Sequence, residues 1–374
     1  MRGAIGLPLP DRRIGLSAHD FQQGAAAAQV ILARAVNDGA APTVPARWLL
    51  RLTNLLGGLP PEGPDALAAM RTRGHDLLRL ARRLDAAPER RRAPRPGPVP
   101  PAGAFPAQLS VTQVETLVRD PYAAYARAIL RLRKLDPLGR EPDARERGTL
   151  SHAVLERFVE RTQSGLPEDP AAIYRETCAQ VLAETVPWPA ARAMWAARLE
   201  SLAAWFLAGE AERRRIATPC RREAGGLCAV EDLPAPFRLY ARADRIDLGP
   251  EGAAIYDYKG SIAGVQKTLD YAKQVPLEAA MLLRGAFEGV RADRIAVLQI
   301  LGLGGGGRTV DYDPAGVPDT WDELRALIAA YQAGGLAFPP RARPDLCHDT
   351  GDYDHLSRRG EWFDGDAFAE EQLE

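Results

Sequence analysis

Residues 239–260 read LYARADRIDLGPEGAAIYDYKG, which is two short apolar strands joined by a Gly-Pro-Glu-Gly turn. If this hairpin closes on the two-residue loop Pro250-Glu251, position i on the first strand faces position 501 − i on the second. Asp244 then lies directly opposite Asp257, and cross-strand neighbours have Cβ atoms about 4.5–5.5 Å apart. The stretch therefore predicts a pair of acidic side chains on one face of a sheet.

Lys259 follows Asp257 by two residues, so its side chain points to the same face. Two carboxylates and one ammonium group fit a hard divalent cation with a positive charge beside the water that the cation binds. Opposed acids destabilise a hairpin unless something cationic lies between them, and the apolar neighbours increase that cost. The alternative is a salt-bridged edge hairpin in which Lys259 pairs with Asp244 or Asp257. The residues alone leave both interpretations open.

The pattern of Asp244 followed by Asp257-Tyr258-Lys259 resembles the core of the PD-(D/E)xK nucleases, in their RecB-like branch. The resemblance implies an α/β fold with a mixed central sheet flanked by helices, as in restriction endonucleases. It also implies a metal-dependent deoxyribonuclease that uses one or two Mg²⁺ ions. In that scheme Asp244, Asp257 and the peptide carbonyl of Tyr258 are metal ligands, and Lys259 orients or deprotonates the attacking water.

Upstream of the hairpin, residues 147–158 (RGTLSHAVLERF) have apolar side chains at three- and four-residue steps, which predicts a helix. His152 and Glu156 are i, i+4 neighbours on that helix. A lone helical histidine is more often an ordinary surface or core residue. The resemblance instead implies that His152 is a metal ligand and that Glu156 is an accessory acid.

Downstream, residues 271–278 (YAKQVPLE) stand where the family carries a helix with a glutamine. Gln274 matches that glutamine and is assigned a catalytic role on this basis. The tyrosine usually found four residues later is replaced by Glu278, so this half of the motif departs from the family. Gln274 could equally be an ordinary polar residue of a helix.

The chain has three blocks. Residues 1–85 are rich in Ala, Leu and Arg and are expected to be mostly helical, whereas 86–108 is a Pro/Arg-rich stretch that predicts an extended linker without regular structure. Residues 109–374 show a compact α/β pattern. It begins with a capping box at Ser110 and continues with helices that fill roughly 148–216. The hairpin follows, and then a strand at 294–303.

The N-terminal block resembles the end of the helicase-like region of AddB-type subunits, which belong to bacterial helicase–nuclease complexes that repair double-strand breaks for homologous recombination. Several segments carry this resemblance: 13–21, 30–35, 42–50, 109–112, 120–122, 130–133 and 352–356. It implies a C-terminal part of such a subunit, an AddA-type helicase-nuclease partner and single-stranded DNA ends as substrate. The rival interpretations are a non-catalytic DNA-binding scaffold that keeps the nuclease fold, and a free-standing RecB-like exonuclease.

Related nucleases of this kind carry an iron–sulfur cluster whose first cysteine directly precedes a Pro-aromatic pair. Here Asp120 occupies that position, and Cys347 is all that remains of a C-terminal cysteine triplet. A cluster needs four thiolates, so we predict no iron–sulfur cluster. The cysteines lack a C-x2–4-C pair, which also disfavours a zinc site.

The net charge is −1, but residues 1–147 hold 23 Lys and Arg against 14 Asp and Glu, and residues 148–374 hold 25 against 35. A basic N-terminal part and an acidic C-terminal part suit a protein that binds the phosphate backbone of a nucleic acid and cleaves it. Candidates for contacts with the DNA backbone are Arg131, Arg133 and Lys134, which could equally form a solvated face. No run of about 18 apolar residues and no signal pattern occurs, so a cytoplasmic protein without membrane contact is expected.

Overall fold

A computed structural model describes residues 10–39, 41–89, 92–135, 142–262 and 265–373. The chain divides into two units, Met1–Arg91 and Arg92–Glu374. Within the described ranges, no helix combines the length and the apolar character that crossing a membrane requires.

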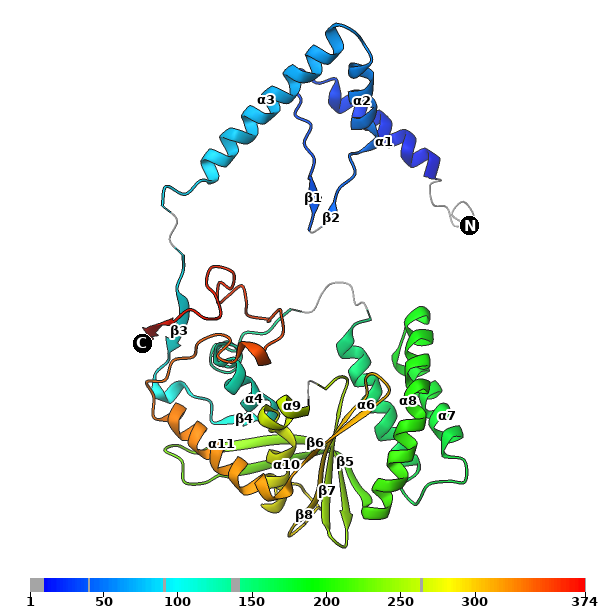
Figure 1. Cartoon of the computed structure of the whole chain (residues 1–374), viewed down its shortest axis with the longest axis vertical. Coiled ribbons are helices and arrows are strands. Elements are labelled where there is room, and N and C mark those ends of the chain that lie inside the picture. Colours follow the sequence, from blue (N-terminus) through cyan, green and yellow to red (C-terminus); the bar gives the residue numbers. More distant parts are fainter. Residues whose placement is uncertain (1–9, 40, 90–91, 136–141, 263–264, 374) are drawn as a thin grey trace. The chain divides into compact units, whose positions relative to one another are not determined.

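The described residues of the first unit form three helices and a two-stranded ribbon (Figure 1). The helices are α1 (Pro10–Ala25), α2 (Arg47–Gly57) and α3 (Glu62–Asp85), and the ribbon pairs β1 (Asn37–Asp38) with β2 (Ala41–Pro42). The described part of this unit is helical, as its Ala- and Leu-rich composition predicts. Many of its apolar side chains are exposed, and they include Leu55, Leu77 and Leu84.

The second unit is built on a six-stranded mixed sheet in the order β4-β6-β7-β8-β9, with β5 paired to β6. Its strands are β4 (Gln108–Ser110), β5 (Thr218–Val230), β6 (Phe237–Gly249), β7 (Gly252–Lys259), β8 (Ile295–Gly302) and β9 (Arg308–Tyr312). β5 lies along one edge of β6, and β4 and β7 share the other edge. β7 and β8 are parallel, whereas β6–β7 and β8–β9 are antiparallel. The predicted α/β class with a mixed central sheet is confirmed.

Helices cover both faces of this sheet (Figure 1). Their bounds are α4 (Val111–Arg119), α5 (Pro121–Ala124), η3 (Tyr125–Ile129), α6 (Ala144–Arg161), α7 (Pro170–Thr185), α8 (Pro189–Ile216), α9 (Val265–Tyr271), α10 (Gln274–Leu283) and α11 (Val317–Gln332), with short 3-10 turns η2 (Ala102–Ala104), η4 (Pro314–Gly316) and η5 (Pro344–Leu346). One apolar core joins α4, α10 and α11 to the sheet, and a second core joins α6, α7 and α8 to its opposite face. The alternation of strand side chains separates the two cores, since Ile255 belongs to the first and Tyr256 to the second.

The hairpin has the predicted register. Ladder pairs run from Gly249↔Gly252 to Arg245↔Tyr256, and each pair sums to 501. Asp244 and Asp257 are therefore opposite each other, one step beyond the last ladder pair. At that step the side chain of Asp244 replaces a ladder bond, because its Oδ2 accepts the backbone N–H of Tyr258 at 2.7 Å.

The entry to the second unit is capped as the sequence predicts. The Ser110 hydroxyl accepts the N–H of Gln113 at 3.1 Å, and the Gln113 side chain accepts the N–H of Ser110 at 2.8 Å. Asp120 then caps α5 by accepting the N–H of Ala123 at 3.1 Å. Asp120 therefore has a local capping role at the position where the resemblance implies a cluster cysteine.

The expectation that 86–108 lacks regular structure is wrong for part of that stretch. Residues Arg95–Val99 form strand β3, which pairs in parallel with β10 (Phe368–Gln372) in the acidic tail. The Arg95 guanidinium explains why a proline-rich segment is held there. It is 8% exposed and donates to the backbone carbonyls of Pro340, Arg341, Asp364 and Asp366.

Strand β5 is absent from the sequence-based expectation, which places the hairpin directly after the helices. Its sequence, TPCRREAGGLCAV, has charged residues and a glycine pair where a strand normally carries β-branched side chains. The structure explains one glycine, because a Cβ at Gly226 would lie 2.7 Å from the ring of Phe287. Tertiary packing, and not local propensity, makes this segment a strand.

A buried ionic network ties helix α8 to strand β6. The Arg245 guanidinium donates to both oxygens of Asp247, at 2.8 and 2.6 Å, and to Glu210 Oε2 at 2.7 Å. Glu210 also accepts from Arg213 at 3.1 Å and from Arg214 at 2.7 Å. Arg245 is 1% exposed, and the Asp247 and Glu210 carboxylates are fully buried. The network lies on the face of β6 that packs against α8.

Candidate active site

Asp244 lies between the part of β6 that pairs with β4 and the part that pairs with β7. β4 pairs with β6 as far as Tyr240, and β7 pairs with it from Arg245 onward. Between these two pairings, the structure as described places no strand beside Ala241–Asp244 on that edge. Asp244 Oδ1 lies 3.4 Å from His152 Nδ1 on α6, so the carboxylate that holds the Tyr258 peptide also reaches the predicted histidine ligand.

Asp257, Lys259 and Gln274 form one hydrogen-bonded cluster. Gln274 Nε2 donates to Asp257 Oδ1 at 2.8 Å, and Gln274 Oε1 accepts from Lys259 Nζ at 2.7 Å. Lys259 Nζ also lies 3.1 Å from Asp257 Oδ1 and 3.0 Å from Oδ2. A lysine only donates, so it fixes the orientation of the Gln274 amide. Gln274 is therefore a clamp between the acid and the ammonium group, and not an ordinary polar helix residue.

Glu278, which replaces the family's tyrosine, completes the bonding of the Gln274 amide. Its Oε1 accepts from Gln274 Nε2 at 3.0 Å, and the side chain is fully buried. Its other oxygen has no hydrogen-bond partner among the described residues. Burial, followed by the charge of Asp257, raises the pKa of Glu278 well above its ordinary value. The raised pKa favours the neutral form of Glu278 beside the clamp.

Glu115 on α4 approaches the same cluster from the other side. Its Oε1 accepts the backbone N–H of Gln274 at 2.9 Å and so caps the first residue of α10. Burial raises the pKa of Glu115, and the nearby charge of Lys259 opposes that shift. Helix α4 of the second unit therefore helps to place Gln274.

The site shifts the pKa values of its central groups. Burial, opposed by Lys259 and reinforced by Asp244, raises the pKa of Asp257 to about 6. Burial disfavours the charged form of His152, but the hydrogen bond and the charge of Asp244 outweigh it and raise the pKa of His152. Both groups must lose their protons to bind a cation, so cation affinity is expected to fall as the pH drops, first through the raised pKa of His152 and then through about 6 for Asp257.

We predict that Asp257→Asn stabilises the metal-free protein above pH 6. The pKa of Asp257 is higher in the folded state than its ordinary 3.8, so folding binds a proton that the unfolded chain releases. Wild-type stability therefore falls as the pH rises from about 4 through about 6, by about 3 kcal/mol in all. Asparagine does not titrate, and in the variant Lys259 keeps its bond to Gln274. Urea unfolding in EDTA should show a gain of about 3 kcal/mol near neutral pH that disappears near pH 4. A difference that is independent of pH would contradict the assignment.

His152, Glu223 and Asp244 each direct one ligand atom into a common space, with all three atoms within 4.8 Å of one another. Two ligands of a single ion lie at most about 4.2 Å apart for Mg²⁺ and about 5 Å apart for Ca²⁺. The three side chains can share one divalent cation if they close around it, because neighbouring ligands in octahedral Mg²⁺ geometry lie about 3 Å apart. Asp257 is outside this group, since its carboxylate faces Lys259 and Gln274.

Sequence reasoning missed Glu223 and Glu115. Glu223 lies on β5, which was not predicted as a strand, and Glu115 lies on a helix that no motif links to the hairpin. The predicted accessory acid Glu156 is half-buried on α6, and its charge acts on Glu223. Burial, followed by the charge of Asp244, raises the pKa of Glu223.

The predicted DNA contacts lie on an exposed segment after η3. Arg131, Arg133 and Lys134 are all exposed, and Arg131 has a φ of 58°. Lys134 pairs with Asp352 at 3.2 Å, and the hydroxyl of Tyr353 donates to the carbonyl of Leu132 at 2.8 Å. The segment that contains Asp352 and Tyr353 therefore holds the basic segment 131–134 in place. Their contact with DNA stays a prediction.

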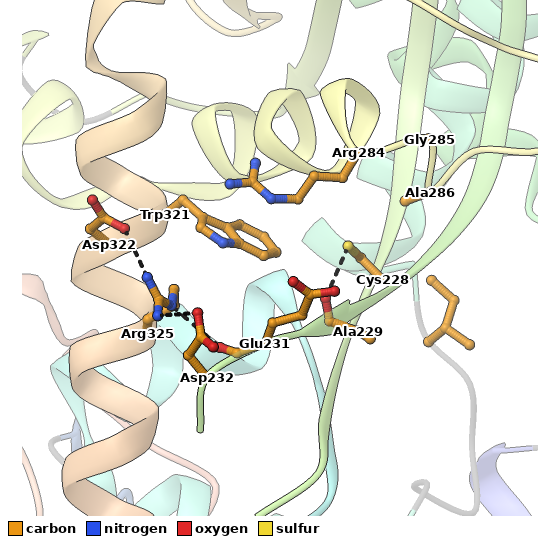
Figure 2. Close-up of a pocket in the computed structure, with 11 residues that line it drawn as sticks. Cys228, Ala229, Glu231, Asp232, Arg284, Gly285, Ala286, Trp321, Asp322 and Arg325 are labelled. Carbon is orange, nitrogen blue, oxygen red and sulfur yellow. Dashed lines mark hydrogen bonds and ion pairs between the residues drawn. The ribbon is translucent and has the colours of Figure 1, made fainter. Parts of the chain in front are cut away.

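A cavity of about 510 Å³ opens elsewhere, between the end of β5 and helices α10 and α11 (Figure 2). Arg284 stacks over the ring of Trp321 at 4.0 Å, and Arg325 pairs with Asp232 at 2.9 Å. None of the residues that line it belongs to the predicted site. The predicted site residues therefore lie beside the hairpin and not in this cavity.

Relatives of known sequence match part of the chain. An uncharacterized protein of Rickettsia bellii is 28% identical over 186 residues, which is 49% of this chain and 22% of that protein. An uncharacterized protein of Rickettsia conorii is 29% identical over 192 residues, again 49% of this chain and 23% of its own length. The match spans less than a quarter of each relative. The crystal structure of SSO0001 aligns over 59% of this chain with 14% identity and a TM-score of 0.26.

The sequence profile of the PD-(D/E)XK nuclease superfamily matches residues 108–349, which are more than half of the chain. This range contains His152, Asp244, Asp257, Lys259 and Gln274. Together with the mixed sheet and the clamped Asp-x-Lys cluster, the match shows that this chain belongs to the PD-(D/E)XK nuclease superfamily.

Proposed function

We propose that this chain is a Mg²⁺-dependent DNA nuclease, with exonuclease action in double-strand break repair. The observation that supports it most is the cluster in which Gln274 joins Asp257 to Lys259, with Asp244 one step away on the neighbouring strand. A fold retained only for binding has no need to hold a buried acid whose pKa is raised to about 6.

In this proposal Asp244, Asp257 and His152 hold one or two Mg²⁺ ions, with the Tyr258 carbonyl as a further ligand. A divalent cation held there supplies Lewis acidity, which lowers the pKa of water and offsets charge on a phosphate. The Tyr258 N–H keeps Asp244 in place through the bond to its Oδ2. Asp244 is therefore oriented before any cation binds.

Lys259 has the position and the charge of a group that orients the attacking water. Its side chain is 39% exposed, whereas that of its partner Asp257 is 2% exposed, so the ammonium group faces the open side of the cluster. The hydrogen bond from Lys259 to Gln274 keeps the ammonium near the phosphate that it would neutralise. Glu278 and Glu115 hold Gln274 in position for this task.

The substrate and the partner follow from the resemblance to AddB-type subunits. We propose single-stranded DNA ends as substrate, an AddA-type helicase-nuclease subunit as partner, and Met1–Arg91 as the end of a helicase-like region. The exposed Arg131, Arg133 and Lys134 are proposed to contact the DNA backbone. The presence of exposed apolar side chains in Met1–Arg91 supports burial of that unit against further protein.

A nuclease assay on linear single-stranded and duplex DNA tests this proposal. We expect cleavage with Mg²⁺, none with EDTA, and a loss of about a hundredfold or more in Lys259→Ala. Arg238→Ala is a matched control, because Arg238 is an exposed basic residue on the neighbouring strand β6. DNA binding without any Mg²⁺-dependent cleavage would instead support the non-catalytic scaffold.

A further inference from the structure

We infer that Glu223 on β5 is an additional protein ligand of the divalent cation, and that it binds the cation together with Asp244 and His152. The inference rests on the proposed function in one respect, since it needs a cation at Asp244. It adds strand β5 to the site, alongside α6, β6 and β7.

The register of β5 against β6 places Glu223 directly opposite Asp244. Arg222 pairs with Arg245 and Ala224 pairs with Ala243, so Glu223 faces Asp244 between two ladder pairs. Carboxylates directly opposite each other on antiparallel strands repel each other. A cation between them converts this repulsion into shared coordination.

The backbone of Glu223 departs from the strand at this position. Its φ is 47°, in the left-handed region that residues other than glycine rarely adopt. The residue in this conformation is Glu223 itself, and not Gly225, which lies two residues later. The register is the same on both sides of Glu223, so this backbone conformation is confined to the one residue that faces Asp244. The Glu223 carboxylate then lies with Asp244 and His152 in a group whose ligand atoms are all within 4.8 Å.

The competing explanation is that Glu223 serves only its ion pair with Arg242, at 2.5 Å. The Arg242 side chain is 62% exposed, whereas that of Glu223 is 22% exposed. An ion pair with such an exposed partner contributes little to stability and would not maintain an unfavourable backbone conformation. The other side chains near Glu223 are acidic or imidazole groups, which favour a cation as its partner: Glu156, Asp244 and His152.

The ligand set also predicts which cation binds best. Two carboxylates and one imidazole suit Mn²⁺ better than Mg²⁺, since Mg²⁺ strongly prefers oxygen ligands in near-ideal octahedral geometry. We therefore expect the full chain to bind Mn²⁺ more tightly than Mg²⁺, and Glu223 to contribute to that affinity.

The test is a Mn²⁺ titration of the full 374-residue chain, followed by electron paramagnetic resonance of the free ion. Glu223→Gln should weaken Mn²⁺ binding by about tenfold or more, as loss of a group that supports a metal site does. Glu223→Asp keeps the charge and should recover part of the affinity. Thermal unfolding in EDTA checks that each variant is folded.

Two controls separate the explanations. Arg242→Gln removes the competing partner and should leave Mn²⁺ affinity unchanged or higher. Glu160→Gln removes an exposed acid of α6 and should bind as the wild type does. A Glu223→Gln affinity within twofold of the wild type would overturn the inference.

Asp244→Asn distinguishes failure of this inference from failure of the proposed function. If Asp244→Asn loses Mn²⁺ while Glu223→Gln keeps it, the cation site stands and Glu223 is not a ligand. If Asp244→Asn and Glu223→Gln both bind Mn²⁺ as the wild type does, the cation site itself is wrong and the proposed function fails with it.

Discussion

Asp257→Asn is expected to reduce Mg²⁺-dependent cleavage by about a thousandfold or more, because Lewis-acid catalysis contributes several kcal/mol to transition-state stabilisation. The exchange keeps the shape of the side chain and removes its charge. It also removes the negative partner of Lys259, which keeps its bond to Gln274. We expect the variant to fold and to bind DNA, since Asp257 is 1% exposed and offers no surface to a DNA backbone.

Asp311→Asn is the matched control. Asp311 is an exposed carboxylate on β9 of the same sheet, where it accepts a hydrogen bond from Gln299 at 2.6 Å. Its loss should leave the rate of cleavage unchanged. Cleavage by Asp257→Asn at the rate of the wild type would reject the assignment of Asp257. The same variant is predicted above to be more stable than the wild type without metal, so lost activity together with gained stability would identify Asp257 as a functional residue.

Arg245→Met is expected to lower the free energy of unfolding by about 3–5 kcal/mol, which is the cost of removing one partner from a buried ion pair. Asp247 then loses both of its hydrogen bonds to the guanidinium, and Glu210 loses one of three. Methionine fills part of the space but satisfies neither carboxylate. Urea unfolding of the two proteins at neutral pH measures the difference.

Arg238→Met on the same strand serves as the control, because Arg238 is exposed and its replacement should change stability by no more than about 0.5 kcal/mol. A loss below about 1 kcal/mol for Arg245→Met would show that water or rearrangement satisfies the network. The account of how α8 is fixed to β6 would then be wrong.

The hairpin and the placement of its charged side chains could be predicted because both depend on local sequence. A two-residue turn fixes the register of the flanking strands, so counting from Pro250 is enough to place Asp244 opposite Asp257. The alternation of side chains then puts Lys259 on the same face as Asp257. The caps at Ser110 and Asp120 were equally accessible, since a capping side chain acts within three residues of its own position.

The parts that depend on distant contacts could not be predicted. The sequence of β5 has low strand propensity, and the strand is held by pairing with β6 and by Phe287 packing against Gly226. The sequence alone therefore did not indicate where Glu223 lies. Strand β3 pairs with the acidic tail at β10 more than 260 residues later, and the buried Arg95 guanidinium fixes that contact. A proline-rich stretch with no local partner is typical of a linker, and only the tertiary structure shows otherwise.

The departure of Glu278 from the family pattern has a physical account. Glu278 occupies the position of a tyrosine in the motif, and here it accepts from Gln274 while remaining fully buried. Burial and the charge of Asp257 raise its pKa, which favours the uncharged form in the space of an uncharged side chain. The substitution therefore preserves the orientation of Gln274.

Diffraction from crystals grown with Mn²⁺ tests the central claim most directly, because the anomalous signal of Mn²⁺ locates the ion without reference to activity. The account predicts an anomalous peak within about 2.0–2.6 Å of a carboxylate oxygen of Asp244. It further predicts that Asp257 or Glu223 completes the coordination. Crystals that bind Mn²⁺ only at other positions, with Asp244 and Asp257 in contact with no ion, would contradict it.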